Sequence, residues 1–264
     1  MPAKSLTAAA LHLGLAVFFR NDFYWYGRNC VDNPYYDFSL FFVAGWWIAE
    51  KLRPPKQVPA GHPAWGAALA VVAWGCYLTW KGPYLGMASF LLTSILLLRF
   101  LTPGVSRRVD GLYCAVLFTM PFPFYAEFLS ILQLFAQRAS LGLMALMSAP
   151  LSHEGSLVHL KDGPVRVAAA CSGFQSLIVL FAISALLAHL LELNFARKFM
   201  LIAFSIVSSI AFNVLRVTAM LGVGQAWGVD TAVKFWHGPS AWIFYLMALG
   251  SLVWAGAVLK RRRR

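Results

Sequence analysis

Three side chains whose chemistry suits acyl transfer stand in separate segments of the C-terminal half of the chain. They are Cys171 in AAACSGFQS, Arg216 in FNVLRVTAM and His237 in KFWHGPSAW. A thiolate can attack a carbonyl carbon, an imidazole can protonate the departing amine, and a guanidinium can stabilise the oxyanion. These groups form a site only if the elements that carry them bring them to one place.

The composition indicates that those elements are membrane-spanning helices. The chain has 264 residues, of which 60% are hydrophobic and 12% are charged, whereas about 25% are charged in an ordinary soluble domain. About 20 mostly apolar residues are needed to cross a bilayer as a helix. Eight segments approach that length, some of them short: residues 6–20, 36–52, 64–80, 85–101, 112–132, 172–191, 199–218 and 239–259.

The net charge of +12 first suggests a nucleic-acid partner, but the positions of the basic residues favour another explanation. Eight spans place both termini on one side of the membrane. If that side is the cytoplasm, it holds 14 of the 22 Lys and Arg residues, as the positive-inside rule requires. We therefore predict an integral protein of the cytoplasmic (inner) membrane, with both termini in the cytoplasm and no nucleic-acid partner.

The same topology places the three candidate side chains at the outer, periplasmic face. Cys171 heads the sixth span, Arg216 lies near the end of the seventh, and His237 directly precedes the eighth. Each has an ordinary alternative: a small buried residue, a snorkelling anchor and an interfacial histidine, respectively. Nothing in the span assignment required the three to coincide, so their coincidence favours an active site that faces the exterior.

The longest stretch between spans, residues 133–171, is predicted to be extracytoplasmic and leads into the cysteine. Its first part, to about residue 147, is either a helix on the outer surface or a continuation of the fifth span. Its second part, residues 155–170, alternates apolar and polar residues around Asp162–Gly163, which indicates a β-hairpin. We therefore expect one integral membrane domain over residues 1–264. It would be an all-α polytopic bundle of about eight transmembrane helices, with a small extracytoplasmic β-hairpin before the cysteine.

Two further residues are candidates for supporting roles. Asn213 lies three residues before Arg216 on the same helical face. It could orient Arg216 or a substrate carbonyl, or it could form a hydrogen bond between helices. Glu127 is an acidic residue within the fifth span. It could pair with a cation at the outer face or shape a peptide channel, or it could be a carboxylate near water at the end of the span.

The chain resembles the exosortase/archaeosortase family of multipass membrane cysteine transpeptidases. Three motifs carry the resemblance: Ala170–Cys171–Ser172–Gly173, Asn213–Val214–Leu215–Arg216 and His237. They occur in the family's order and on the expected side of the membrane, and Pro121–Phe122–Pro123 and the hairpin fit as well. The resemblance covers about residues 110–260, so we expect the exosortase-like catalytic core over 106–264. Residues 1–105 match only in hydropathy and form N-terminal spans of variable character.

The resemblance implies a reaction and its partners. The substrates would be exported proteins whose C-terminal sorting signal consists of a short Pro-Glu-Pro-like (PEP-CTERM-like) motif, a transmembrane helix and a basic tail. Cys171, supported by Ser172 and Gly173, would attack the scissile carbonyl and form a thioester. His237 would protonate the leaving amine, and Arg216 would stabilise the oxyanion or the thiolate. An amine on a lipid or glycan acceptor would then take the acyl group, with membrane lipids around the protein.

Other functions remain as alternatives. A polytopic transporter or lipid-handling protein would carry polar or broken helices near the membrane midplane, and the spans here hold few ionisable residues. A scaffold protein that kept the fold and lost the activity is a further alternative. His153, Glu154 and His159 match no zinc-binding pattern, so we predict neither a metal site nor a cofactor.

Overall fold

The computed structural model describes residues 2–51, 63–101, 115, 116, 119, 121, 125–147 and 149–261. The chain divides into two compact units, Met1–Pro123 and Phe124–Arg264. We describe each unit by itself, because the second contains all the candidate site residues.

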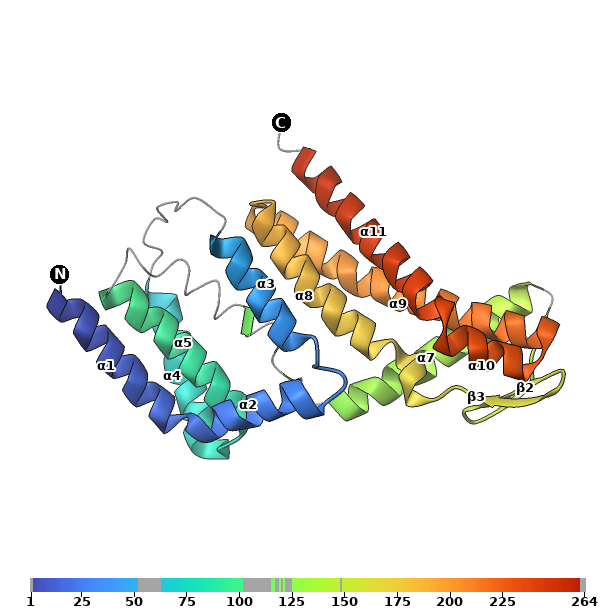
Figure 1. Ribbon diagram of the computed structural model, residues 1–264, viewed down its shortest axis with the longest axis horizontal. Helices are drawn as coiled ribbons and strands as arrows, with labels where there is room; N and C mark the ends of the chain where they lie inside the picture. Colours follow the sequence, from blue (N-terminus) through green and yellow to red (C-terminus); the bar gives the residue numbers. More distant parts are fainter. Residues whose placement is uncertain are drawn as a thin grey trace. The chain divides into compact units, whose positions relative to one another are not determined.

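The described part of the first unit is helical (Figure 1). Its helices are α1 (Pro2–Phe18), α2 (Arg20–Asp32), α3 (Ser39–Lys51), α4 (Pro63–Trp80) and α5 (Pro83–Leu101). Proline is favoured at the first position of a helix because its missing N–H would have no partner there, and Pro63 and Pro83 occupy that position. Helix α5 packs against α1, α2 and α4, around the fully buried ring of Phe19.

The second unit contains helices and one small sheet (Figure 1). Its elements in chain order are α7 (Tyr125–Leu146), β1 (His153–Glu154), β2 (Leu157–Leu160), β3 (Gly163–Arg166), the 3₁₀ turn η1 (Ala169–Ser172), α8 (Phe174–Leu190), α9 (Phe195–Trp227), α10 (Val229–His237) and α11 (Pro239–Arg261). Helix α9 packs against α7, α8, α10 and α11. It is therefore the central element of this unit.

Apolar contacts and serine pairs join α8, α9 and α11. Leu180, Leu201 and Leu252 are almost completely buried in one cluster between the three helices. The hydroxyl of Ser205 donates to that of Ser184 at 3.2 Å, and a second pair, Ser208 with Ser251, lies at 2.8 Å. Pairs of this kind satisfy polar groups that have no water available inside a membrane bundle.

The predicted hairpin is confirmed and is extended by a third strand. β2 and β3 are antiparallel, with Leu160 opposite Gly163, and β1 adds to the other edge of β2. The tip of the hairpin packs closely on α9, because a Cβ at Gly224 would overlap the Leu160 side chain. The backbone N–H of Lys161 also donates to the Gln225 side chain at 3.1 Å. The sheet is thereby held on the C-terminal end of α9.

The membrane fold class is also confirmed. Four helices in the described residues are long and apolar enough to cross a membrane: Tyr125–Leu146, Ala169–Leu190, Phe195–Trp227 and Ser240–Arg261. Shorter apolar helices lie at Ala9–Phe18, Ser39–Ala49, Ala70–Trp80 and Pro83–Leu97. Seven of the eight predicted spans therefore correspond to helices α1, α3, α4, α5, α8, α9 and α11.

The bounds of the predicted fifth span, residues 112–132, are wrong. Pro121 lies outside any helix, and α7 begins at Tyr125 and continues without interruption to Leu146. Proline disfavours helical backbone at the residue before it, so Pro121 and Pro123 account for this late start. Residues 102–114, which include the beginning of the predicted span, lie outside the described residues. Of the two structures considered for the region after residue 132, the continuous helix is correct.

Helix α9 is longer than the predicted seventh span. Its 33 residues extend over about 50 Å, whereas the hydrocarbon core of a bilayer is about 30 Å thick. The C-terminal part of α9 is covered by the sheet, α7 and α10. Protein contacts therefore cover one face of this part of the helix.

Candidate active site

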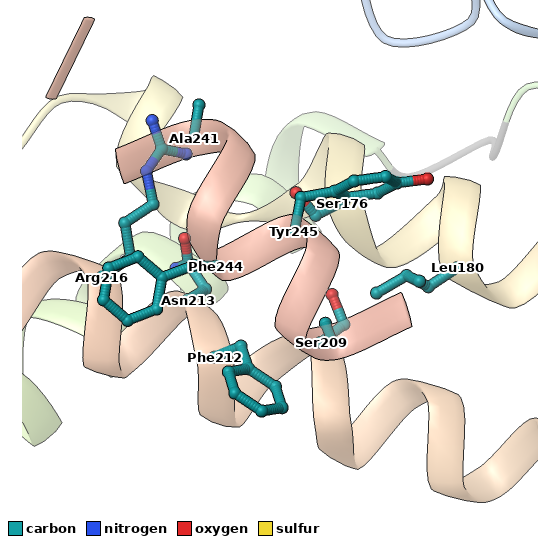
Figure 2. Close-up of a pocket in the computed structure, with 10 residues that line it drawn as sticks. Ser176, Leu180, Ser209, Phe212, Asn213, Arg216, Ala241, Phe244 and Tyr245 are labelled. Atoms are coloured by element: carbon teal, nitrogen blue, oxygen red, sulfur yellow. The ribbon is translucent and has the colours of Figure 1, made fainter. Parts of the chain in front are cut away.

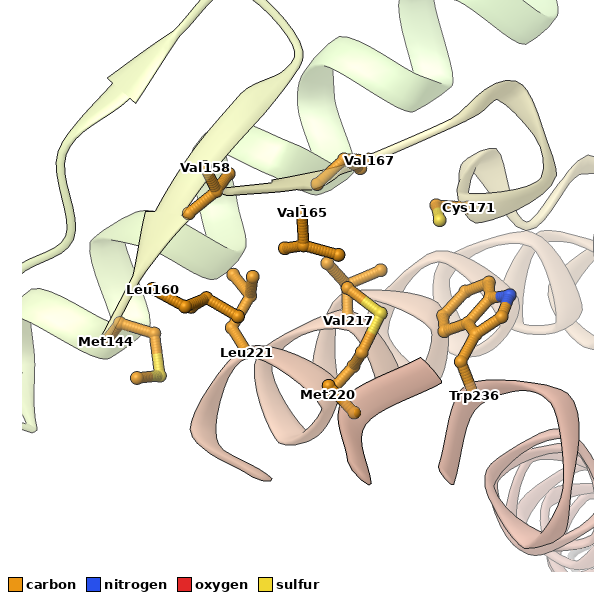
Figure 3. Close-up of a cluster of buried hydrophobic side chains, with 11 residues drawn as sticks. Met144, Val158, Leu160, Val165, Val167, Cys171, Val217, Met220, Leu221 and Trp236 are labelled. Carbon is orange, nitrogen blue, oxygen red and sulfur yellow. The ribbon is translucent and has the colours of Figure 1, made fainter. Parts of the chain in front are cut away.

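Cys171 lies in the η1 turn, directly after the sheet and before α8. Its side chain belongs to a buried cluster with Val165, Val167, Val217 and Trp236, and Figure 3 shows it above the Trp236 ring. Its backbone N–H donates to the Ala168 carbonyl at 2.8 Å, and the residue is 4% exposed. The sheet and α9 therefore hold the thiol in an enclosed apolar setting.

Two motif neighbours of Cys171 shape the start of α8. The Ser172 hydroxyl accepts a hydrogen bond from the Phe174 N–H at 3.2 Å, which satisfies one of the N–H groups left open at a helix start. Gly173 has a left-handed conformation, with φ of 74°, and a Cβ at this position would overlap the Asn213 side chain. Glycine is required here both by its backbone and by the close approach of α9.

The Asn213 side chain forms a hydrogen bond with the backbone of this turn. Its Nδ2 donates to the backbone carbonyl of Cys171 at 2.8 Å, and Asn213 is 7% exposed. The structure therefore brings Asn213 to the cysteine, where it joins α9 to the turn that carries the thiol.

Arg216 lies one helical turn further along α9 and contacts the corner between α10 and α11. Its Nη2 donates to the Trp236 carbonyl at 3.2 Å and its Nε donates to the Ser240 hydroxyl at 3.3 Å. Its Cζ lies 3.7 Å from the centre of the Trp236 ring. The half-buried guanidinium also interacts electrostatically with Cys171. A snorkelling arginine extends its charged group into water, whereas the Arg216 guanidinium binds protein groups.

His237 is the last residue of α10, and α11 begins two residues later at Pro239. The backbone thus places it directly before the last long helix, as the sequence predicts. Its side chain lies outside the described part of the structure. The residues on either side, Trp236 and Ser240, are the two that Arg216 contacts, so the corner that carries the histidine is tied to α9.

Glu127 is not brought to this site by any hydrogen bond or ion pair among the described residues. It lies exposed in the first turn of α7, where the helix dipole favours a carboxylate. His159 Nε2 on β2 and Glu154 Oε1 on β1 lie 4.0 Å apart, and both residues are exposed. Within the described residues, no three His, Cys, Asp or Glu side chains are grouped so that they could hold a metal ion.

Sequence reasoning missed a set of polar residues on one face of α7. Gln133 Nε2 donates to the Val167 carbonyl at 2.6 Å, and Gln137 Nε2 donates to the Gly155 carbonyl at 2.6 Å. The Ser140 hydroxyl donates to a carbonyl of α9, that of Val214, at 3.0 Å. Their spacing of four and three residues on an apolar helix marks one face, and that pattern would have identified them. Gln133 and Gln137 hold the sheet and the segment that follows it on α7, and Ser140 joins α7 to α9.

A pocket adjoins Asn213 and Arg216 between α8, α9 and α11. Its polar lining is Ser176, Ser209, Asn213, Arg216 and Tyr245, and Figure 2 shows these side chains with the apolar residues around them. It contains about 270 Å³ of empty space, part of which is open to the surroundings. The buried Ser209 hydroxyl has no hydrogen-bond partner among the described residues.

Comparison with known proteins identifies a family for this chain. The family model described as transmembrane exosortase matches residues 32–254, which cover parts of both compact units and every candidate site residue. No curated protein and no solved structure matches the chain.

Proposed function

The chain belongs to the transmembrane exosortase family, and on this basis we propose that it is a membrane-embedded cysteine transpeptidase. Cys171 is the nucleophile, and Arg216 and His237 complete the catalytic site. The enzyme cuts C-terminal sorting signals of exported proteins at the outer face of the membrane and transfers the protein to an acceptor.

One observation carries this proposal. A single turn of α9 contacts both parts of the site. Asn213 donates to the backbone of Cys171. Arg216 donates to Trp236, which directly precedes His237, and to Ser240, which follows it at the start of α11. Catalysis requires reacting groups to be held in a fixed geometry. A rigid helix in contact with both elements supplies such a reference, which a cysteine buried merely for packing would not need.

The proposed chemistry begins at the thiol. Cys171 Sγ attacks the carbonyl carbon of the scissile peptide bond, the carbon–nitrogen bond breaks, and a thioester forms. The proton lost by the thiol passes through the His237 imidazole to the departing amine, which leaves as the start of the membrane-helix fragment. The Arg216 guanidinium stabilises the thiolate before the attack and the oxyanion during it.

The second half of the reaction releases the protein. An acceptor amine on a lipid or glycan attacks the thioester, a new carbon–nitrogen bond forms, and the carbon–sulfur bond breaks. His237 takes the proton from the amine, and the sulfur leaves as a thiolate that Arg216 stabilises. If water attacks in place of the amine, the product is a free carboxylate and the reaction is hydrolysis.

The substrate class follows from the family and from the position of the site. A PEP-CTERM-like signal has its cleavable motif directly before a transmembrane helix and a basic tail. The motif would reach the site at the outer face if the basic residues at both ends of the chain remain in the cytoplasm. Arg197 and Lys198, at the start of α9, would then also be cytoplasmic, and Arg216 would lie near the opposite surface.

The proposal is tested by expressing the full chain with a reporter preprotein that ends in a PEP-CTERM-like signal. Cys171→Ala should abolish conversion of the precursor while the variant still inserts into the membrane, as judged by its resistance to alkaline extraction. Cys76→Ala is the matched control and should leave processing unchanged, because Cys76 lies on α4 in the other unit. Normal maturation of the reporter by the Cys171→Ala variant would contradict the proposal.

A further inference from the structure

Trp236 contacts Arg216 in two different ways. The guanidinium carbon lies 3.7 Å from the centre of the indole ring, within the range of a cation–π interaction. The carbonyl of the same residue accepts from Nη2 at 3.2 Å. The Trp236 side chain is itself held, since it is 8% exposed and packs in the cluster that contains Cys171.

These contacts determine the orientation of the guanidinium. The ring lies against the face of the planar group, while Ser240 accepts from Nε and the Trp236 carbonyl accepts from Nη2. Nη1 forms no hydrogen bond with the described residues. A planar group fixed on one face and at two donors presents its other N–H groups in defined directions.

The indole also lies close to the thiol. Figure 3 shows the Trp236 ring and Cys171 on the same side of one buried cluster, to which the sheet, α7, α9 and α10 all contribute side chains. Arg216 and Cys171 interact electrostatically. A change at the ring therefore reaches the thiol in two ways: through the packing around the sulfur and through the placement of the cation.

We propose that Trp236 is a positioning residue, whose indole holds the Arg216 guanidinium in the orientation that stabilises the Cys171 thiolate. This inference rests on the proposed role of the thiol and adds a residue outside the three motifs that define the candidate site. Trp236 itself touches neither substrate nor acceptor in this account. It acts through Arg216.

The test measures alkylation of Cys171 by iodoacetamide in the detergent-solubilised full chain, followed site by site with peptide mass spectrometry across a range of pH. Trp236→Phe keeps an aromatic face, whereas Trp236→Leu keeps an apolar side chain without one. Altered packing that admits the reagent changes the alkylation rate at every pH, and altered packing that admits water moves the midpoint to lower pH, because water stabilises the thiolate. Displacement of the cation instead moves the midpoint to higher pH.

We expect Trp236→Phe to keep the wild-type midpoint closely. Trp236→Leu should move the midpoint to higher pH and slow alkylation at neutral pH on the order of tenfold, a size compatible with loss of a cation–π contact. Trp254→Leu is the matched control, because Trp254 lies on α11 and is 67% exposed, and its profile should not change.

Equal midpoints for Trp236→Leu and Trp236→Phe would overturn the proposal. If Trp236→Leu does not fold, Trp236→Met replaces it, since methionine fills irregular apolar space, and the expectation is the same. Loss of folding in both variants while Trp236→Phe folds would show that the ring serves stability, and it would also overturn the proposal. The assay needs no substrate, so its outcome is separate from that of the Cys171→Ala processing experiment.

Discussion

The side-chain amide of Asn213 donates a hydrogen bond of 2.8 Å to the backbone carbonyl of Cys171. This contact joins the longest helix of the second unit to the turn that carries the proposed nucleophile. It depends on Gly173, whose missing side chain leaves room for Asn213. Cys171, Gly173 and Asn213 thus form one local arrangement, and the contribution of each can be tested by a separate substitution.

Replacing Asn213 by Asp should impair catalysis strongly. An ionised carboxylate cannot donate a hydrogen bond, so its oxygen would face the Cys171 carbonyl oxygen without a proton between them. Loss of such a buried contact costs about 1–3 kcal/mol, which corresponds to a decrease of roughly fivefold to 150-fold in the rate of precursor cleavage. The rate is measured with the reporter preprotein in isolated membranes.

Asn194→Asp is the matched control for that prediction. The Asn194 side chain caps α9 by accepting from the Arg197 N–H at 3.1 Å, and an aspartate can accept in the same way. Cleavage should therefore be unchanged. Similar losses in both variants would show that the Asn213 contact has no specific role.

Gly173→Ala should lower both stability and activity. The left-handed backbone alone costs about 1–2 kcal/mol for an L-residue, and the new methyl group would overlap Asn213. Thermal unfolding followed by the fluorescence of a thiol-reactive dye and the reporter assay together measure the effect.

Gly142→Ala on α7 is the control for Gly173→Ala, because a Cβ at this position meets no atom within 4 Å. It should be neutral or slightly stabilising, since alanine favours helix formation over glycine by about 1 kcal/mol. A Gly173→Ala variant as stable and active as Gly142→Ala would contradict the close packing described for the turn.

Gly224→Val should detach the hairpin from α9. The Cβ of the new valine would overlap the Leu160 side chain and would lie 3.1 Å from the Cβ of Ala232. Overpacking of this kind costs about 1–3 kcal/mol. We expect a lower unfolding temperature and faster proteolysis between β2 and β3. Gly222→Val carries the same helix-propensity cost, and a Cβ there meets nothing within 4 Å, so equal effects in the two variants would count against the hairpin contact.

Cys30 should react slowly with iodoacetamide, although it lies in the polar segment after the first span. Burial raises the pKa of its thiol above the ordinary value, so at neutral pH the thiolate fraction is smaller than in a free cysteine. Alkylation of Cys30 in the folded chain should rise only at alkaline pH, later than in the denatured chain. Reaction at the same pH in both states would contradict this prediction.

The membrane fold could be predicted from the sequence because long apolar segments have few structural alternatives. The hairpin before Cys171 was also predictable from the alternation of its residues. The limits of the fifth span were not, since hydropathy is continuous through Pro121 and Pro123 while the helix begins at Tyr125. Hydropathy also could not show that α9 continues to Trp227, because its last turns pack on the sheet and on α10.

Within the site, the sequence identified three candidate residues on consecutive elements, but not which atoms meet. It also predicted Arg216 near the end of its span, whereas Arg216 lies inside α9, which continues to Trp227. The Asn213 contact with the Cys171 backbone and the stacking of Arg216 on Trp236 depend on rotations of three helices about their axes. Those rotations are fixed by packing, as at Gly173 and Gly224. Trp236 was overlooked because an aromatic residue at a membrane surface is ordinary.

The most direct test of the account is to trap the acyl-enzyme. Membranes containing the full chain and the reporter preprotein are denatured rapidly in acid, and Cys171 peptides are analysed by mass spectrometry. We predict that the reporter's cleaved end is attached to Cys171 as a thioester, which neutral hydroxylamine releases, and that Arg216→Lys lowers its yield. Cleavage of the reporter with no adduct on Cys171 and no loss of activity in Cys171→Ala would contradict the central claim.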